Sequence, residues 1–171
     1  RYKECIELYR QILKQDPNNY EARWKCARAC WKYGKTAKKL HLENCEEVCA
    51  AYGKEGMAHA RCAIALEPDK PEGYYYNGLN AGIYSDGVSI FVAFKEGLKN
   101  EVQQSLERVY ALDKMYDRAQ SILALGRFWA VVPWPFRDKK KALAYYREYR
   151  ATGFFSENNE AKFFLAELLT K

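Results

Sequence analysis

Apolar residues recur along most of the chain at the spacing of an α-helix. In residues 3–14, Cys5, Leu8 and Ile12 follow one another at intervals of three and four, so they share one helix face. The β-branched run 88–94 is interpreted as the start of a buried helix rather than as a strand. The sequence therefore predicts an all-α protein. Further helices are expected at about 20–33, 42–66, 72–84, 88–112, 116–131, 138–150 and 157–170.

Glycine and proline predict where these helices end. Gly34 is expected just past the end of the helix that begins near Tyr20, because glycine is favoured at that position. Pro68 ends the long third helix and Pro133 ends the helix over 116–131, since proline cannot continue a helix.

One scheme occurs three times along the chain, in LKQDPNNYEARWKCARACWKYG, ALEPDKPEGYYYNGLNAGIYSDG and ALDKMYDRAQSILALGRFWAVV. An apolar helix end leads into an acidic turn, which lacks proline only in the third segment, and an aromatic-rich helix follows. This scheme resembles the tetratricopeptide repeat, a pair of helices that touch at small residues. Ala60 departs from the family, which usually has an aromatic residue there. The residues in the family's characteristic positions are Cys26, Ala27, Cys30, Gly56, Ala63, Pro68, Tyr74, Gly78, Leu125, Gly126 and Trp129.

The resemblance implies an all-α, right-handed solenoid of tetratricopeptide-like helical hairpins. Residues 1–171 are expected to form a single domain with three repeat units and a terminal helix on each side.

A narrower resemblance covers nearly the whole chain and is best over residues 56–170. The run from Asp113 to Ala142 is similar to the repeat family associated with bacterial TRAP-type periplasmic transporters, often called TatT. The residues of this run that match the family are Asp113, Tyr116, Leu125, Gly126, Arg127, Phe128, Trp129, Pro133, Pro135, Asp138, Lys139, Lys140, Lys141 and Ala142. The resemblance implies a periplasmic or exported protein that acts beside transporter components. The long insertion between residues 34 and 56 and the aromatic helices also resemble the eukaryotic regulator of microtubule dynamics proteins, which implies a cytoplasmic alternative.

Four of the six cysteines form two pairs with the same spacing: Cys26, Cys30, Cys45 and Cys49. On an antiparallel hairpin that turns between residues 37 and 38, they would form Cys30–Cys45 and Cys26–Cys49 disulfide bridges. Repeat geometry instead places Cys26 and Cys30 as shielded thiols near Ala60 and Gly56, and leaves the second pair on a more accessible helix start. Cys5 and Cys62 have no evident partners and are interpreted as small core residues.

A metal site is the third reading of the second cysteine pair. His41, Cys45 and Cys49 fall on one helix face, but close zinc-ligand pairs usually lie in loops. No metal ion or cofactor is therefore expected. No enzymatic motif, such as a paired nucleophile and base or a glycine-rich phosphate loop, occurs in the sequence, and the protein is expected not to be an enzyme.

Composition narrows the class of partner. The chain is 49% hydrophobic and 29% charged, which is typical of a soluble globular protein, and it has no apolar run long enough to span a membrane. The net charge of +6 is spread among residues of both signs, so no nucleic-acid partner is expected.

Binding residues are expected on the first helix of each repeat, which lines the concave surface of such solenoids. Aromatic and arginine side chains are the usual anchors of interfaces, and arginine beside aromatic rings suits a carboxylate. Alternatively, Trp24 and Trp31 only pack against residues 1–14. The candidate residues are Trp24, Arg28 and Trp31 in the first unit, Tyr75, Tyr76 and Leu79 in the second, and Leu123 and Arg127 in the third.

The sequence thus predicts a non-enzymatic binding scaffold for a protein partner or for a small apolar or acidic ligand. A stand-alone carrier with an apolar pocket and an intracellular adaptor are the alternatives, and a homo-oligomer is left open.

Overall fold

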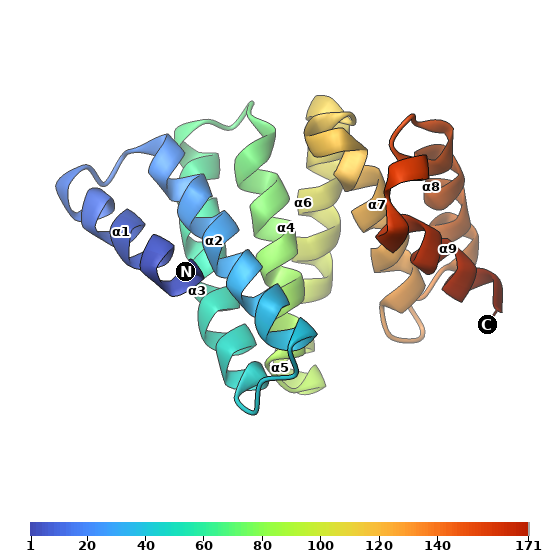
Figure 1. The fold of residues 1–171 in the computed structure, drawn as a ribbon, viewed down its shortest axis with the longest axis horizontal. Helices are drawn as coiled ribbons and strands as arrows, with labels where there is room; N and C mark the ends of the chain where they lie inside the picture. Colours follow the sequence, from blue (N-terminus) through green and yellow to red (C-terminus); the bar gives the residue numbers. More distant parts are fainter. Residues whose placement is uncertain (171) are drawn as a thin grey trace. The chain divides into compact units, whose positions relative to one another are not determined.

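The computed structural model describes residues 1–170, and within them the chain is helical with no β-strand. The elements are α1 (Tyr2–Gln15), α2 (Tyr20–Lys39), α3 (Cys45–Leu66), α4 (Pro71–Asp86), α5 (Ile90–Lys95), α6 (Leu98–Asp113), α7 (Tyr116–Val131), α8 (Lys139–Ala151), the 3-10 helix η1 (Phe155–Glu157) and α9 (Asn159–Thr170). Figure 1 shows their order along the chain. None of the helices in the part of the chain described is both long and apolar enough to cross a membrane.

The chain divides into two compact units, Arg1–Ser105 and Leu106–Lys171, here called unit 1 and unit 2. The division falls within α6. The expectation of a single domain over 1–171 stays a prediction, and each unit is described by itself.

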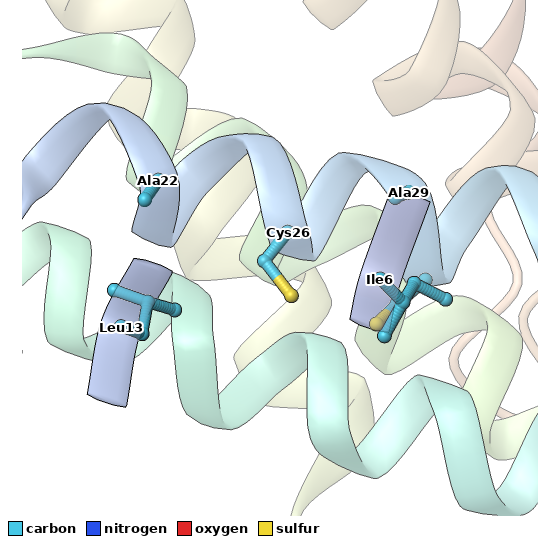
Figure 2. Packing of buried hydrophobic residues seen from close by; sticks show 6 residues of the cluster. Ile6, Leu13, Ala22, Cys26 and Ala29 are labelled. Atoms are coloured by element: carbon cyan, nitrogen blue, oxygen red, sulfur yellow. The ribbon is translucent and has the colours of Figure 1, made fainter. Parts of the chain in front are cut away.

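Unit 1 is built from helices that pack in chain order. α1 packs on α2, α2 packs on α3 and α4, and α3 packs on α4 (Figure 1). Ile6 and Leu13 of α1 meet Ala22, Cys26 and Ala29 of α2 in one buried cluster (Figure 2). Burial of this apolar surface, rather than helix propensity, stabilises the pairing of α1 with α2.

Glycines let the helices of unit 1 approach closely. A β-carbon on Gly34 would lie 2.5 Å from Cγ2 of Ile83, and one on Gly56 would collide with the side-chain amide of Asn80. Asn80 is fully buried and donates hydrogen bonds to the carbonyl oxygens of Ala27 and Tyr76, at 2.9 and 2.7 Å. Asn80 therefore ties α4 to α2 through a buried side chain.

Unit 2 has its own core between α7, α8 and α9. Its buried residues are Ala119, Ile122, Leu123, Tyr146, Tyr149 and Ala161. Gly126 lies at the contact of α7 with α8, because a β-carbon there would stand 2.5 Å from Cδ1 of the Tyr146 ring. At the start of α7, residues 117–119 have left-handed backbone angles, with φ between 47° and 63°.

Two helix predictions are wrong. α2 does not end at Gly34 but continues to Lys39, because Gly34 is used for close packing on Ile83 rather than for a helix end. The helix expected over 88–112 is two helices, separated where Gly97 takes a left-handed conformation with φ 69°.

The run 88–94 is not the start of a buried helix. In α5 the Phe91 side chain is 83% exposed, and Ile90 and Phe94 are also exposed. A short apolar run by itself does not indicate whether the helix that it forms will be covered.

Candidate functional site

Four aromatic side chains meet between α2 and α4. The rings of Trp24 and Tyr76 are stacked, with centroids 5.9 Å apart and planes inclined by 6°. Trp31 lies 6.2 Å from Tyr76 at an angle of 50°, and Tyr75 packs edge-on against Tyr76 at 5.2 Å. Tyr75 and Tyr76 are buried, whereas the two tryptophans remain half-buried at the surface. We call Trp24, Trp31 and Tyr76 the aromatic stack.

Four cations of α2 lie over the rings of this stack. Lys25 Nζ and Arg28 Cζ lie 5.3 and 5.2 Å from the Trp24 ring centroid. Lys32 Nζ and Lys35 Nζ lie 4.7 and 5.4 Å from Trp31. These distances are in the range of cation–π attraction. We call Lys25, Arg28, Lys32 and Lys35 the basic row.

The sequence of α2 explains why positive charge gathers there. Glu21 is the one acidic residue of α2, and it pairs with Lys25 at 2.6 Å. Arg28, Lys32 and Lys35 have exposed side chains. The surface of α2 beside the aromatic stack is therefore strongly positive. The basic residues of this helix are Arg23, Lys25, Arg28, Lys32, Lys35, Lys38 and Lys39.

The predicted binding residues fall into two groups. Trp24, Arg28, Trp31, Tyr75 and Tyr76 come together in unit 1 at the aromatic stack. The ring partner of both tryptophans is Tyr76 of α4, while other residues make the core between α1 and α2.

The remaining predicted residues lie elsewhere. Leu79 is half-buried on α4. Leu123 is a core residue of unit 2, so it is not available to a partner. Arg127 is held within unit 2 by Glu167, at 2.6 Å from Nη1 to Oε2, and its Cζ lies 4.5 Å from the Phe164 ring centroid.

A second constellation was missed by the sequence analysis. Cys26 of α2 faces Glu55 and His59 of α3, and the thiol sulfur, a carboxylate oxygen and an imidazole nitrogen all lie within 4.8 Å of one another. Figure 2 shows the Cys26 side chain directed from α2 toward α3. The spacing of Glu55 and His59, one helical turn apart, is the signal that could have indicated a shared face.

Two arginines adjoin this cluster. Arg10 of α1 donates to both carboxylate oxygens of Glu55, at 2.8 and 2.6 Å. Arg23 Nη1 lies 3.2 Å from Nδ1 of His59, and its Nε and Nη2 donate to the carbonyl oxygen of Pro17. His59 Nε2 faces Glu55 Oε1 at 3.6 Å.

The cluster shifts the pKa values of its members. A hydrogen bond from Cys30 and the neighbouring His59 lower the pKa of Cys26 to about 6, although burial acts in the opposite direction. Burial lowers the pKa of His59, but Cys26 and Glu55 outweigh burial and raise it to about 9. Burial raises the pKa of Glu55, but hydrogen bonds from His59 and Arg10 hold it at about 2. Unit 1 thus contains a partly buried group of strongly interacting charges.

All six cysteines are free thiols, so neither the Cys30–Cys45 nor the Cys26–Cys49 bridge is formed. The reason is the length of α2, which moves the turn to residues 40–44. Cys49 Sγ lies 3.9 Å from the carbonyl oxygen of Gly34. Gly34 is eight residues beyond Cys26, a helical rise of about 12 Å. A disulfide needs Cα atoms within about 7 Å.

The accessibility of the cysteines also differs from expectation. Cys49 is buried rather than accessible, and Cys62 is exposed rather than part of the core. Cys26 and Cys30 are buried, and the part of α3 beside Cys26 carries Glu55 and His59, whereas Gly56 faces Asn80 of α4.

Each unit also has a surface hollow. In unit 1 a hollow of about 450 Å³ lies between α3, α4 and α6, where Arg61 and Asn77 both bind Glu101. In unit 2 a hollow of about 280 Å³ is lined by apolar side chains and by Arg127, Arg137 and Lys139. Both hollows mix polar and apolar groups.

Comparison with known proteins agrees on the fold. No family model matches the chain, and no curated protein matches its sequence. Among solved structures, the crystal structure of MamA protein matches with a TM-score of 0.54 and 21% sequence identity, over 99% of this chain and 78% of that chain. MamA is a tetratricopeptide-like helical protein. This chain has a tetratricopeptide-like fold. The prediction of an all-α helical solenoid is confirmed, while the narrower likeness to TatT stays a prediction.

Proposed function

We propose that the protein is a non-enzymatic interaction scaffold that binds an acidic segment of a protein partner on α2. The observation that carries the proposal is the aromatic stack with the basic row along its rings. The tetratricopeptide-like fold supports a partner that is a protein.

The chemistry of the surface suits carboxylates. Arg28 can grip a carboxylate with two parallel N–H donors, and its position over the Trp24 ring restricts its motion before binding. Lys32 lies one turn further along α2, so successive acidic side chains of an extended segment would each meet a cation. The half-buried tryptophans supply apolar area for the same partner.

Poly-L-glutamate is a direct probe of this surface. We expect it to bind with a change in tryptophan fluorescence, and to bind more weakly as salt is raised, because exposed charges are screened. The charge reversals Arg28→Glu and Lys32→Glu should each weaken binding roughly tenfold, which corresponds to ~1.4 kcal/mol. Lys140→Glu, an exposed lysine in unit 2, is the matched control and should bind like the unmodified protein.

Two outcomes would overturn the proposal. One is equal weakening by Lys140→Glu, since binding would then reflect net charge alone. The other is that heparin binds as tightly as poly-L-glutamate and that Trp31→Ala weakens the binding of neither polymer. The aromatic stack would then contribute nothing to binding.

The finer proposal is that the scaffold is an exported component that works beside a TRAP-type solute transporter. Its support is the run from Asp113 to Ala142, which resembles TatT. Subcellular fractionation of the native protein tests the compartment, and recovery in the cytoplasm alone would contradict this proposal. Native mass spectrometry tests for a co-purified small apolar or acidic ligand and for a homo-oligomer.

A further inference from the structure

We propose that Cys26, Glu55 and His59, together with Cys30, form a zinc-binding site between α2 and α3. This site lies away from the aromatic stack and does not depend on the proposed partner. It differs from the alternative considered from the sequence, in which His41, Cys45 and Cys49 would hold the metal.

The geometry is close to that of a tetrahedral site. Zinc binds sulfur at about 2.3 Å and nitrogen or oxygen at about 2.0–2.2 Å, so ligand atoms around it lie roughly 3.3–3.8 Å apart. The ligand atoms of Cys26, Glu55 and His59 already lie within 4.8 Å of one another. Small side-chain rotations would therefore close them around one ion, without movement of either helix.

We assign Cys30 as the fourth ligand, because it is buried one helical turn from Cys26 and interacts with the Cys26 thiol. Its sulfur is not among the ligand atoms that already lie within 4.8 Å of one another, so the Cys30 side chain would have to turn toward them. A zinc ion would replace the shared proton of this thiol pair, as metals do when they bind cysteine. Two sulfurs, one imidazole nitrogen and one carboxylate oxygen form a donor set that zinc accepts.

The surrounding charges fit this donor set. Two thiolates and one carboxylate carry three negative charges, which one zinc ion and Arg10 together balance. Arg10 occupies only one lone pair on each oxygen of Glu55, so the carboxylate can still bind a metal while Arg10 fixes its orientation. The ion also has a way in, because the His59 and Glu55 side chains are 14% and 23% exposed.

Arg23 opposes metal binding. We assign Nε2 of His59, which faces Glu55, as the ligand, and Nδ1 must then carry the imidazole proton. Arg23 Nη1 lies 3.2 Å from Nδ1, so it has to move away when the metal binds. Nε and Nη2 of Arg23 can keep their hydrogen bonds to the carbonyl oxygen of Pro17, so only the Nη1 contact with His59 is lost.

Two other uses of the cluster are excluded by the same contacts. A cysteine–histidine–glutamate arrangement could activate a nucleophile, but Cys26 has no exposed surface for a substrate to reach. A disulfide between Cys26 and Cys30 is also excluded. Side chains four residues apart on a helix have Cβ atoms about 5–6 Å apart, whereas a disulfide requires about 3.5–4.5 Å.

The test uses Co²⁺ as a spectroscopic probe and Zn²⁺ as its competitor, on the full chain. We expect one Co²⁺ per chain with a sulfur-to-cobalt charge-transfer absorption band that Zn²⁺ abolishes. Cys26→Ser and His59→Gln should each weaken binding at least roughly tenfold to a hundredfold. Arg23→Gln should tighten it several-fold, an effect that a merely structural role of the cluster would not produce.

Controls come from the same residue types outside the cluster. Cys62→Ser removes an exposed thiol and His41→Gln an exposed histidine, and both should bind Co²⁺ like the unmodified protein. If Cys26→Ser fails to fold, as judged by far-UV circular dichroism, the Co²⁺ affinities of His59→Gln and Arg23→Gln test the proposal. The proposal is overturned if the folded protein gives no charge-transfer band, or if the band survives unchanged in His59→Gln.

Discussion

The backbone of Gly126 in α7 lies against the ring of Tyr146 in α8, so closely that a β-carbon at position 126 would stand 2.5 Å from Cδ1 of that ring. Tyr146 is itself almost fully buried. This contact is the close helix approach that the repeat pattern predicts at Gly126, and it leads to a test of packing in unit 2.

Gly126→Ala should destabilise the protein by about 1–2 kcal/mol. The added methyl group overpacks the contact with Tyr146, which outweighs the better helix propensity of alanine. Gly82→Ala in α4 is the matched control, because nothing lies within 4 Å of its β-carbon position, and it should stabilise by about 0.5–1 kcal/mol. Urea unfolding measures both changes. An unchanged midpoint for Gly126→Ala would mean that α7 and α8 are not packed at this glycine.

Asn80→Ala should cost about 1–3 kcal/mol of stability, because the carbonyl oxygen of Ala27 loses a buried donor and a cavity opens beside Gly56. Asn100→Ala, at an exposed asparagine, should change stability by less than about 0.5 kcal/mol. The comparison is again made by urea unfolding. Equal effects of the two substitutions would contradict a bridging role for the Asn80 amide.

Glu101 should make the free energy of unfolding depend on pH. Burial raises its pKa, but the Arg61 fork at 2.8 and 2.7 Å and the Asn77 amide outweigh burial and hold the pKa below 4.5. A carboxyl whose pKa is lower in the folded state stabilises that state above the unfolded pKa, and loses this contribution as pH falls through the folded value. Glu101→Gln should therefore destabilise by about 1–2 kcal/mol at pH 7.

Chemical denaturation at a series of pH values checks this prediction. The stability difference between the unmodified protein and Glu101→Gln should be constant from neutral pH down to about pH 5 and shrink below pH 4.5. A difference that stays constant below pH 4.5 would show that Glu101 is not held by Arg61 in solution.

The thiols should react in the order of their exposure. Iodoacetamide is expected to label exposed Cys62 first, half-buried Cys5 and Cys45 next, and buried Cys49 much later. Burial also raises the pKa of Cys49 to about 11, which reduces its thiolate fraction further. Peptide mass spectrometry over time measures the order. In Cys62→Ser the fastest phase should disappear, and labelling of Cys49 as fast as Cys62 would contradict the packing of α3 on α2.

Much of the fold could be predicted from sequence where a local signal is enough to define an element. The apolar spacing of residues 3–14 led to the observed helix α1, but Leu8 and Ile12 are exposed and its buried residues are Ile6 and Leu13. The small residue at Gly126 led to the observed contact. The predicted helix end at Gly34 is wrong because glycine occurs both at helix ends and where two helices approach closely. The contact with Ile83, which shows that Gly34 is a point of close approach, is visible only in the structure. The predicted burial of residues 88–94 is wrong because the apolar character of a segment does not specify which element, if any, packs against it.

The candidate site could be predicted only in part. The spacing of Trp24, Arg28 and Trp31 on one helix indicated a shared face, and the stack on Tyr76 requires only that α4 packs on α2. The group of Cys26, Glu55 and His59 depends on the register of α3 against α2. That register follows from a turn at residues 40–44, which no local sequence signal indicates.

The contact between Gly56 and Asn80 has an evolutionary consequence. Because a β-carbon at position 56 would occupy the place of the Asn80 amide, the two positions cannot change independently. Among homologous sequences, a larger residue at 56 should occur only together with a smaller one at 80, and the change at 80 should come first. The two positions should therefore covary, and their covariation in sequence alignments would show that the close packing of α3 on α4 has been preserved.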